Sequence, residues 1–324
     1  YNKTDYDDAD YDITSYSVDT LGAGVSIGYP ISETSSLNYG LTASQDSLSS
    51  GTYTVPSILE FMANNGGDYT EADFTNVKAS IGWGESTLNR GILPNRGYSQ
   101  SVTLQTTVPA ASDLEFYKLD YRGQHFTPLS KQTALRLHTE LGYGDGFGDT
   151  DGLPFYENYF AGGISSVRGF RNGSLGPRAV ASLAFPNISS NPNQLPNYDP
   201  VTGIYQCNPA TGICTDPDQD DQPFGGNVMI TGGVDYLFPL PFIKDQSSLR
   251  TTFFVDVGNV FSTNCDDFQV DCNSPDLGDL AVSTGFGLTW ITAMGPLGFA
   301  IATPIKEPDN SDPQFFQFTL GQTF

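Results

Sequence analysis

The stretch LRTTFFVDVGNVF, residues 249–261, alternates between two kinds of side chain. Its apolar side chains belong to Leu249, Phe253, Val255, Val257 and Phe261, and its intervening polar ones to Arg250, Thr252 and Asp256. Because successive side chains of a β-strand point to opposite sides, this period of two predicts a strand with one apolar and one polar face.

The same alternation recurs along the chain. In 134–143 the apolar face carries Leu135, Leu137, Leu141 and Tyr143, with Thr139 as the exception, and the other face carries Arg136, His138 and Glu140. In 116–126 the two sets are Tyr117, Leu119 and Tyr121 against Lys118, Asp120, Arg122 and Gln124. In 316–324 they are Phe316, Phe318, Leu320 and Phe324 against Gln317, Thr319, Gly321 and Thr323. We predict about eleven strands, at 16–30, 35–47, 75–88, 98–109, 115–126, 132–143, 226–238, 248–261, 279–292, 297–305 and 314–324.

The apolar faces need a cover. In a soluble protein, helices or a second sheet would supply it, and we find no convincing amphipathic helix in the sequence. A transmembrane helix is also excluded, because no run of about 18 apolar residues occurs and the mean hydropathy is −0.26. Lipid is the simpler cover, with a polar lumen behind the strands.

The connections between these strands differ on the two sides. Short turns are expected at 31–34, 89–97, 127–131, 239–247 and 293–296. The other side holds 48–74, 110–114, 144–225, 262–278 and 306–313. One side with short turns and one with long loops is typical of an antiparallel transmembrane β-barrel of the bacterial outer membrane. We therefore expect the long loops to be extracellular and the C-terminus to be periplasmic.

The formal charge of −23 excludes a nucleic-acid partner, whose phosphates require Lys and Arg. The acidic residues concentrate in the long loops, where solvation is the ordinary explanation and cation-bridged contact with anionic lipid head groups is the sharper one. Two segments, 145–152 and 216–221, are acidic but do not fit the calcium-loop pattern. We predict solvated turns there, with no metal and no cofactor.

Catalysis finds little support in this sequence. The only histidines are His125 and His138, and His138 shares a face with Arg136 and Glu140, which favours a structural polar cluster. No G-x-S-x-G sequence occurs, and no serine has a neighbouring histidine. We predict that the protein is not an enzyme and has no catalytic residues.

The four cysteines form two close pairs, Cys207 with Cys214 and Cys265 with Cys272. Neither spacing is the C-x-x-C of zinc or redox sites, although metal binding stays open as an alternative. Two local disulfides would indicate an oxidising compartment, each stabilising its own loop by about 2–3 kcal/mol.

The connection 144–225 is far longer than an ordinary one of about 4–6 residues. It contains the aromatic stretch Phe155–Gly163, FYENYFAGG, and then Val167-Arg168-Gly169-Phe170. Such a segment is too aromatic for a disordered linker. By strand parity Asp235 and Asp256 both point into the lumen, so a segment folded inward would bring Arg168 to these two carboxylates.

Three motifs in this order resemble the Omp85 superfamily of outer-membrane assembly proteins, especially the branch that forms the central barrel of the β-barrel assembly machinery. They are the 155–163 stretch leading into 167–170, then FVDVG at 254–258, then FQFTLGQTF at 316–324. The resemblance spans essentially the whole chain. It implies a sixteen-stranded barrel preceded by periplasmic POTRA domains, of which this chain would hold the last eleven strands as a single domain, 1–324. The start at Tyr1-Asn2-Lys3-Thr4 agrees, because it looks like the tail of a strand already begun.

The resemblance also implies roles for the motif residues. The long loop enters the barrel and Arg168 pairs with a lumen carboxylate, Gly169 permits the tight turn, and Phe170 packs against the wall. The last strand, with Phe316, Phe318, Gly321 and Phe324, is similar to a β-signal and forms a weak seam that can template incoming strands. Expected partners are unfolded outer-membrane proteins, assembly-machinery lipoproteins, and outer-membrane lipid with lipopolysaccharide. The alternatives are a TamA-like or two-partner secretion barrel, and a passive porin.

Overall fold

A computed structural model describes residues 2–5, 16–51, 54–179, 182–183, 206–207, 214–215, 222–240, 243, 248–265, 269–270, 272, 274–309 and 311–321. Antiparallel strands dominate it, and consecutive long strands pair with one another in a single twelve-stranded sheet. The strands of this sheet are, in order, β1 Asn2–Asp5, β2 Tyr16–Pro30, β3 Ser35–Ser50, β4 Glu71–Ser86, β5 Gly97–Thr107, β6 Phe116–Pro128, β7 Ala134–Gly146, β13 Val228–Phe238, β14 Leu249–Phe261, β16 Ala281–Thr292, β17 Gly295–Lys306 and β18 Phe316–Leu320.

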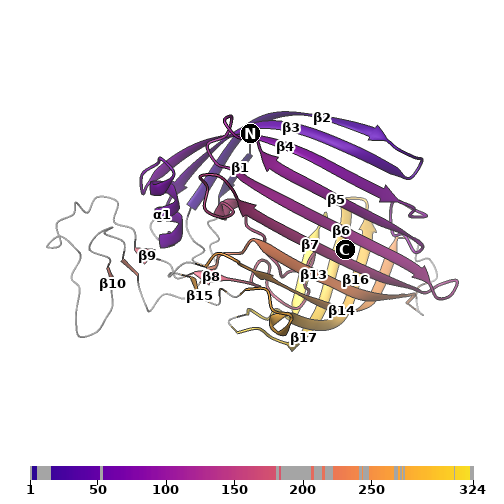
Figure 1. Cartoon of the computed structure of the whole chain (residues 1–324). Helices are drawn as coiled ribbons and strands as arrows, with labels where there is room; N and C mark the ends of the chain where they lie inside the picture. Colours follow the sequence, from indigo (N-terminus) through magenta and orange to yellow (C-terminus); the bar gives the residue numbers. More distant parts are fainter. Residues whose placement is uncertain are drawn as a thin grey trace.

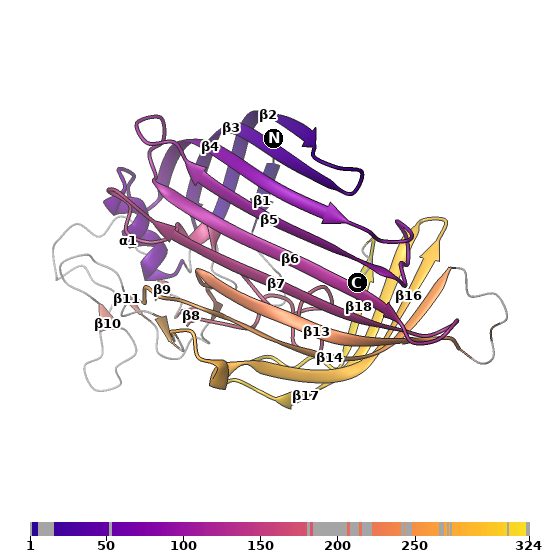
Figure 2. The same cartoon turned by 45° about the vertical axis from the view of Figure 1, so that its right-hand side comes forward.

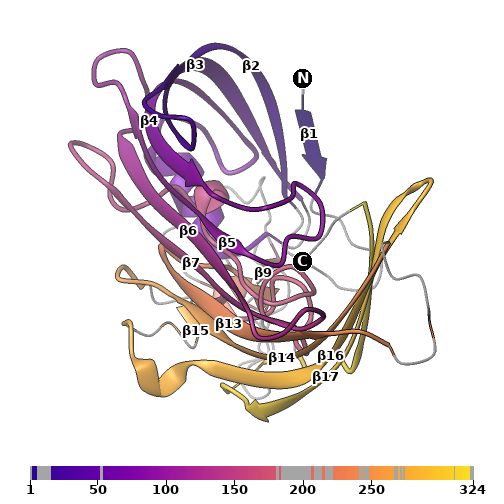
Figure 3. The same ribbon diagram turned by 90° about the vertical axis from the view of Figure 1, so that its right-hand side faces the viewer.

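The eleven predicted strands are all present, and the twelfth is the short β1. It pairs with β2 over Asn2–Asp5, so the residues that looked like a strand tail do form a strand. The sheet curves around an interior, as Figure 3 shows, and β1 and β18 are its two ends. Among the described residues no pairing joins these two ends, so the sheet is an open, curved wall.

The predicted faces of the strands are confirmed by exposure. Leu137, Leu141 and Tyr143 on β7 are exposed on the outside, while Arg136, His138 and Glu140 are partly covered on the inside. Phe316, Phe318 and Leu320 on β18 are likewise exposed, and Gln317 between them is buried. Phe261 on β14 is an exception, because it has the parity of the outward face but is buried. It lies three residues beyond Gly258, the last residue of β14 that pairs with β16, and Gly226 packs against its backbone.

The two ends of the wall differ as the loop lengths predicted. Figures 1 and 2 show α1 (Pro56–Asn64), β8 (Arg178–Ala179), β9 (Ser182–Leu183) and β10 (Gln206–Cys207) gathered at one end, with short turns between the long strands at the other. The remaining small elements are β11 Cys214–Thr215, β12 Gln222–Pro223, β15 Gln269–Val270 and the 3-10 turns η1 Phe155–Glu157 and η3 Leu277–Asp279.

The expectation that no amphipathic helix occurs is wrong. Helix α1 lies in the connection between β3 and β4, and Ile58, Leu59 and Met62 on it are buried. Its nine residues are too few for a clear 3.6-residue period in the sequence. The helix packs in an apolar cluster with Phe155 and Phe74 at the long-loop end, and does not cover the outer face of the strands. Among the described residues no helix combines the length and apolarity needed to cross a membrane.

Candidate functional site

The connection between β7 and β13 turns back into the space enclosed by the sheet. Isolated bridges join Tyr159 to Gly226 and Ala161 to Leu175, so the segment forms its own compact hairpin-like fold. Val167 and Phe170 near its tip are fully buried, in a cluster with Tyr159, Ala161, Leu175, Val260 and Ala281. We call residues 155–177 the docked segment.

Arg168 at the tip of the docked segment lies against two carboxylates. Its Nε and Nη2 atoms donate to Asp256 Oδ2 and Oδ1 at 2.7 and 2.8 Å, and Nη2 also donates to Asp235 Oδ1 at 2.7 Å. The backbone N–H of Arg168 adds a bond to Asp256 Oδ2 at 3.1 Å. All three side chains are at most 3% exposed. The structure therefore brings Arg168 of the inward-folded segment to the two aspartates that strand parity placed on the lumen face, with the bidentate geometry that a guanidinium offers.

The strand register explains why the two aspartates share one arginine. Asp256 on β14 faces Gly233 on β13, and Gly233 faces His138 on β7, so these three positions form one row across the sheet. Glycine fits position 233, because a Cβ there would lie 2.8 Å from the backbone carbonyl of Val255 and would also press on Asp256 Oδ1 at 2.5 Å and His138 Nε2 at 2.8 Å. Asp235 stands two residues further along, in a row with Arg136 of β7.

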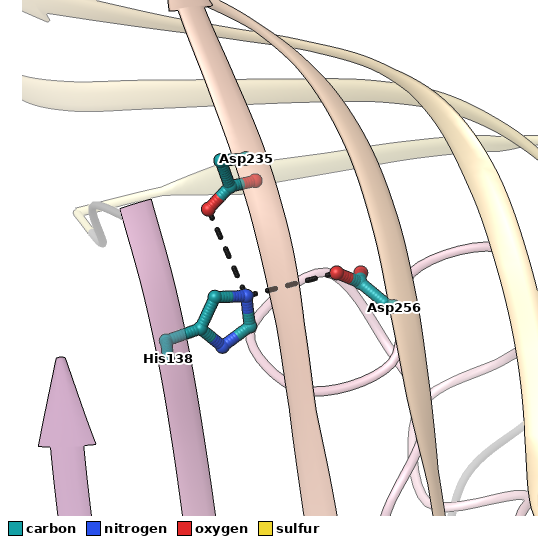
Figure 4. A group of neighbouring side chains, drawn as sticks. All are labelled: His138, Asp235 and Asp256. Atoms are coloured by element: carbon teal, nitrogen blue, oxygen red, sulfur yellow. Dashed lines mark ion pairs between the residues drawn. The ribbon is translucent and has the colours of Figure 1, made fainter. Parts of the chain in front are cut away.

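His138 and Arg136 complete the charged cluster. Figure 4 shows His138 between the two aspartates, with Nε2 3.7 Å from Asp235 Oδ2 and 3.7 Å from Asp256 Oδ1. Arg136 Nη1 donates to Asp235 Oδ2 at 3.1 Å. His138, Asp235 and Asp256 offer three ligand atoms within 4.8 Å of one another, enough to hold a metal ion by geometry. The carboxylate oxygens already accept bonds from two guanidinium groups, so a cation would have to displace Arg168, and the cluster favours charge compensation within the protein.

Three residues of the wall that contact Arg168, Gly169 and Phe170 were not predicted from the sequence. The guanidinium carbon of Arg168 lies 3.6 Å from the ring centroid of Phe254, a cation–π contact from the same inner face as Asp256. Ser283 Oγ on β16 donates to the carbonyl of Arg168. Gln317 on β18 accepts from Gly169 N at 3.1 Å and donates to Phe170 O at 2.6 Å. The parity of Gln317, on the polar face of the last strand, is the signal that could have found it.

Gly169 and Phe170 take the positions the motif suggested. Gly169 has a φ of 92°, and a Cβ on it would lie 3.1 Å from Ala302 Cβ and 3.2 Å from Ser283 Cβ. Phe170 forms an isolated bridge with Pro313, in the connection between β17 and β18. Only glycine combines this φ with so close an approach to the wall.

A second ionic contact holds the docked segment to other strands of the same sheet, β4 and β6. Glu157 in η1 forms ion pairs with two lysines: its Oε1 lies 2.5 Å from Lys78 Nζ of β4, and its Oε2 lies 3.1 Å from Lys118 Nζ of β6. All three side chains are 16–17% exposed. Lys118 Nζ also donates to the carbonyl of Glu157 at 2.7 Å and lies 4.6 Å from the ring centroid of Tyr159. Burial raises the pKa of Glu157, but the two lysines outweigh it and hold the pKa below its ordinary value. The docked segment is thus held to the inner face of the sheet at two places, by β4 and β6 and by β13 and β14.

The space beside Arg168 is polar. A cavity of about 410 Å³ adjoins it and is lined by Arg122, Glu140, Ser165 and Ser166 among others. It gives water access to one side of the charged cluster, so the cluster is sequestered on the wall side and wetted on the other.

The remaining predicted residues fall at the ends of the wall. Gly321 directly follows β18 with a φ of 87°, and its N–H bonds to Pro296 O, while Phe324 lies outside the described residues. Cys265 and Cys272 form a disulfide in the long connection after β14. Cys207 and Cys214 are register partners of β10 and β11, but their side chains lie outside the described part of the chain, as does the acidic segment 216–221.

Comparison with known proteins places these features in a family. Residues 1–324 match the model of the Omp85 superfamily domain. The outer membrane protein assembly factor BamA of Neisseria meningitidis serogroup B is 28% identical over 96% of this chain and 37% of its own length. BamA of Nitratidesulfovibrio vulgaris is 24% identical over 67% of this chain and 21% of its own length. The crystal structure of BamA from Haemophilus ducreyi lacking POTRA domains 1–3 has 28% identity and a TM-score of 0.75, covering 96% of this chain and 55% of that one.

These matches confirm the resemblance inferred from the three motifs, and the all-β barrel fold with it. The chain spans less than two-fifths of the length of either curated relative.

Proposed function

Because this chain belongs to the Omp85 superfamily, we propose that it is part of a barrel that folds and inserts other β-barrel proteins into the bacterial outer membrane. The likeness to the BamA of two organisms supports this assignment. The observation that carries it is the docking of Arg168 on Asp235 and Asp256, which ties one long loop to the wall and, through Gln317, to the last strand. A passive channel would need an open lumen, whereas the docked segment lies against the inner face of this sheet and is held there by ion pairs to β4 and β13.

The mechanism is non-enzymatic and uses the edge of the wall. Strand β18 has five residues and, among the described residues, pairs with β17 alone. When the seam of the barrel opens, its other edge presents backbone N–H and C=O groups. An incoming strand can pair with such an edge by β-augmentation. In lipid each new backbone pair removes an unsatisfied polar group, so insertion is favourable without an external energy source.

The orientation follows from loop length. We place the long loops outside the cell and the short turns, with the C-terminus, in the periplasm. The substrates are then unfolded outer-membrane proteins arriving at the short-turn side, and the partners are lipoproteins of the assembly machinery together with outer-membrane lipid and lipopolysaccharide. The chain is the C-terminal part of a longer barrel protein whose first strands and POTRA domains precede it.

The test follows the folding rate of a urea-unfolded outer-membrane barrel in liposomes, by its heat-modifiable gel shift, with the full-length protein present. We expect the protein to accelerate folding of the substrate barrel, and we expect the Arg168→Ala variant to lose this acceleration. Arg122→Ala is the matched control, since it removes a lumen arginine whose side chain is 71% exposed and lies outside the docked segment. No acceleration, even with partner lipoproteins, would contradict the proposal and favour a secretion barrel; high single-channel conductance would favour a porin.

A further inference from the structure

A shallow hollow lies on the outer face of the wall, where β5, β6 and β7 approach the short-turn end. It has a volume of about 360 Å³. The face follows from parity, because Leu104, Leu119 and Leu137 are exposed on the outside of these three strands. The lining side chains with the same parity are Tyr98, Gln100, Tyr121, His125, Leu137 and Thr139. The hollow therefore opens toward lipid, on the opposite side of the sheet from the docked segment.

Gly123 provides the room for this outer hollow. In the register of the sheet it stands between Gln100 of β5 and Thr139 of β7, so the three positions form one row across the outer face. A Cβ on Gly123 would lie 2.6 Å from the hydroxyl oxygen of Tyr121. The phenol ring of Tyr121 therefore extends along its strand over the glycine, and its hydroxyl lies in the middle of the row.

Glu85 on β4 continues the row and brings a negative charge to the rim of the outer hollow. It pairs with Gln100 in the register, and the amide nitrogen of Gln100 donates to Glu85 Oε2 at 3.3 Å. The hydroxyl of Tyr98 bonds the same carboxylate. Within the part of the chain that the structure describes, no lysine or arginine forms an ion pair with Glu85 or lines the outer hollow. The charge complement of this rim is thus a cation.

Aromatic side chains place the outer hollow at the level of the lipid head groups. Trp83, Tyr98, Tyr236 and Trp290 all belong to the outward face, and each lies within three residues of the short-turn end of its strand. Rows of outward aromatic residues are typical of the girdles that mark the membrane interfaces of transmembrane barrels. A polar hollow among them faces head groups, whereas one nearer the middle of the strands would face hydrocarbon.

The chemistry of the lining favours an ammonium group. Gln100 uses its amide nitrogen on Glu85, so what it offers a ligand is its amide oxygen. Thr139 donates its hydroxyl proton to a backbone carbonyl at 2.9 Å, so its oxygen also serves as an acceptor. The rings of Tyr98 and Tyr121 attract a cation to their faces. A primary ammonium carries three N–H donors for such acceptors, whereas a phosphate would meet the carboxylate with no lysine or arginine in the lining to offset the repulsion.

We propose that the outer hollow binds the head group of a phospholipid that carries a primary ammonium, from the leaflet at the short-turn end. The ammonium would donate to the oxygens of Gln100 and Tyr121, with Glu85 as its counter-charge. The acyl chains would follow the exposed Leu104 and Leu119 toward the middle of the membrane. This inference deepens the lipid contact in the proposed function and rests on its orientation, which makes this leaflet the periplasmic one. The site is separate from the edge of β18.

The test is native mass spectrometry of the full-length protein in detergent, with an equimolar mixture of dioleoyl phosphatidylethanolamine, phosphatidylcholine and phosphatidylglycerol. We expect phosphatidylethanolamine to be retained about 10-fold over phosphatidylglycerol, the size of one charge-assisted hydrogen bond. Glu85→Gln should remove most of this preference. Gly123→Ala should do the same, because its methyl group displaces the Tyr121 hydroxyl, the far end of a flexible side chain.

The matched control is Asp73→Asn. Asp73 shares the outward parity of Glu85 on β4 but lies exposed at the long-loop end of that strand, so its replacement should leave the preference unchanged. Equal retention of phosphatidylethanolamine and phosphatidylglycerol, or a preference that survives in both Glu85→Gln and Gly123→Ala, would overturn the proposal. Retention of phosphatidylcholine equal to that of phosphatidylethanolamine would overturn the assignment to a primary ammonium.

The lipid measurement and the folding assay give separate answers, because no substrate barrel is present when lipid retention is measured. Acceleration of folding by a protein with no lipid preference refutes the head-group site alone. No acceleration by a protein that prefers phosphatidylethanolamine refutes the assembly function alone.

Discussion

Replacing Arg168 by alanine removes the central cation of the lumen cluster. Four hydrogen bonds join Arg168 to Asp235 and Asp256, at 2.7 to 3.1 Å, and three of them come from the side chain. The substitution leaves both carboxylates in place, 1% and 0% exposed, without their main counter-charge. It also removes the cation over the ring of Phe254.

The expected loss follows from which charges remain. Breaking a buried pair by removing one partner costs about 3–5 kcal/mol. Arg136 still neutralises Asp235 at 3.1 Å, whereas Asp256 keeps His138 at 3.7 Å and the bond from the backbone N–H of residue 168 at 3.1 Å. Water in the adjoining cavity relieves part of the remaining charge. We therefore expect Arg168→Ala to lower the free energy of unfolding by about 3 kcal/mol, the lower end of that range.

The assay is urea unfolding of the full-length barrel protein, followed by the heat-modifiable gel shift, with hydrogen exchange of residues 155–177 as a local readout. Asp256→Asn alone and combined with Arg168→Ala completes a double-mutant cycle. We expect the double variant to be more stable than the sum of the single losses predicts, because the carboxylate that lacks a partner is gone. Arg168→Ala within about 0.5 kcal/mol of wild type, the range of ordinary surface substitutions, would refute the reasoning.

Two further perturbations test the docked segment. Glu157 has a pKa held below its ordinary 4.5 by the lysines, so its stabilisation is complete above that value and is lost as the pH falls through the folded-state pKa. Glu157→Gln should therefore lower the free energy of unfolding in urea by about 2 kcal/mol at pH 7. The difference from wild type should shrink toward pH 3, and a difference that stays constant with pH would contradict the ion pair. Gly169→Ala should cost about 1–3 kcal/mol in the same assay through strain at φ 92° and contact with Ser283, whereas Gly91→Ala, with open space around it, should be nearly neutral.

The fold and part of the site were accessible from the sequence because both depend on parity. A period of two assigns each residue of a strand to the lumen or the lipid face, so Asp235 and Asp256 could be placed together without knowledge of the structure. Connection lengths then separated the two ends of the wall. Both properties are local in sequence, and the structure confirms them.

The rest depended on information that parity does not contain. The register that aligns His138, Gly233 and Asp256 in one row is a relation between strands, and one strand's pattern does not specify it. Phe254 is apolar on a polar face, so the alternation leaves it unassigned, yet its ring supports the guanidinium. The contact of Glu157 with Lys78 joins residues 79 positions apart, through a segment whose path is set by packing.

Gln317 gives the docked segment a consequence for the seam. Its amide bonds the backbone of Gly169 and Phe170 from inside β18, on a strand of only five residues. Displacing β18 from the wall therefore breaks two hydrogen bonds to the docked segment, and undocking the segment removes two bonds that hold β18. Such coupling is reciprocal by thermodynamic necessity. If the edge of β18 is where new strands pair, the strength with which Arg168 holds the segment sets how readily that edge can move. The charged cluster then acts on assembly through the seam, with no contact to the substrate itself.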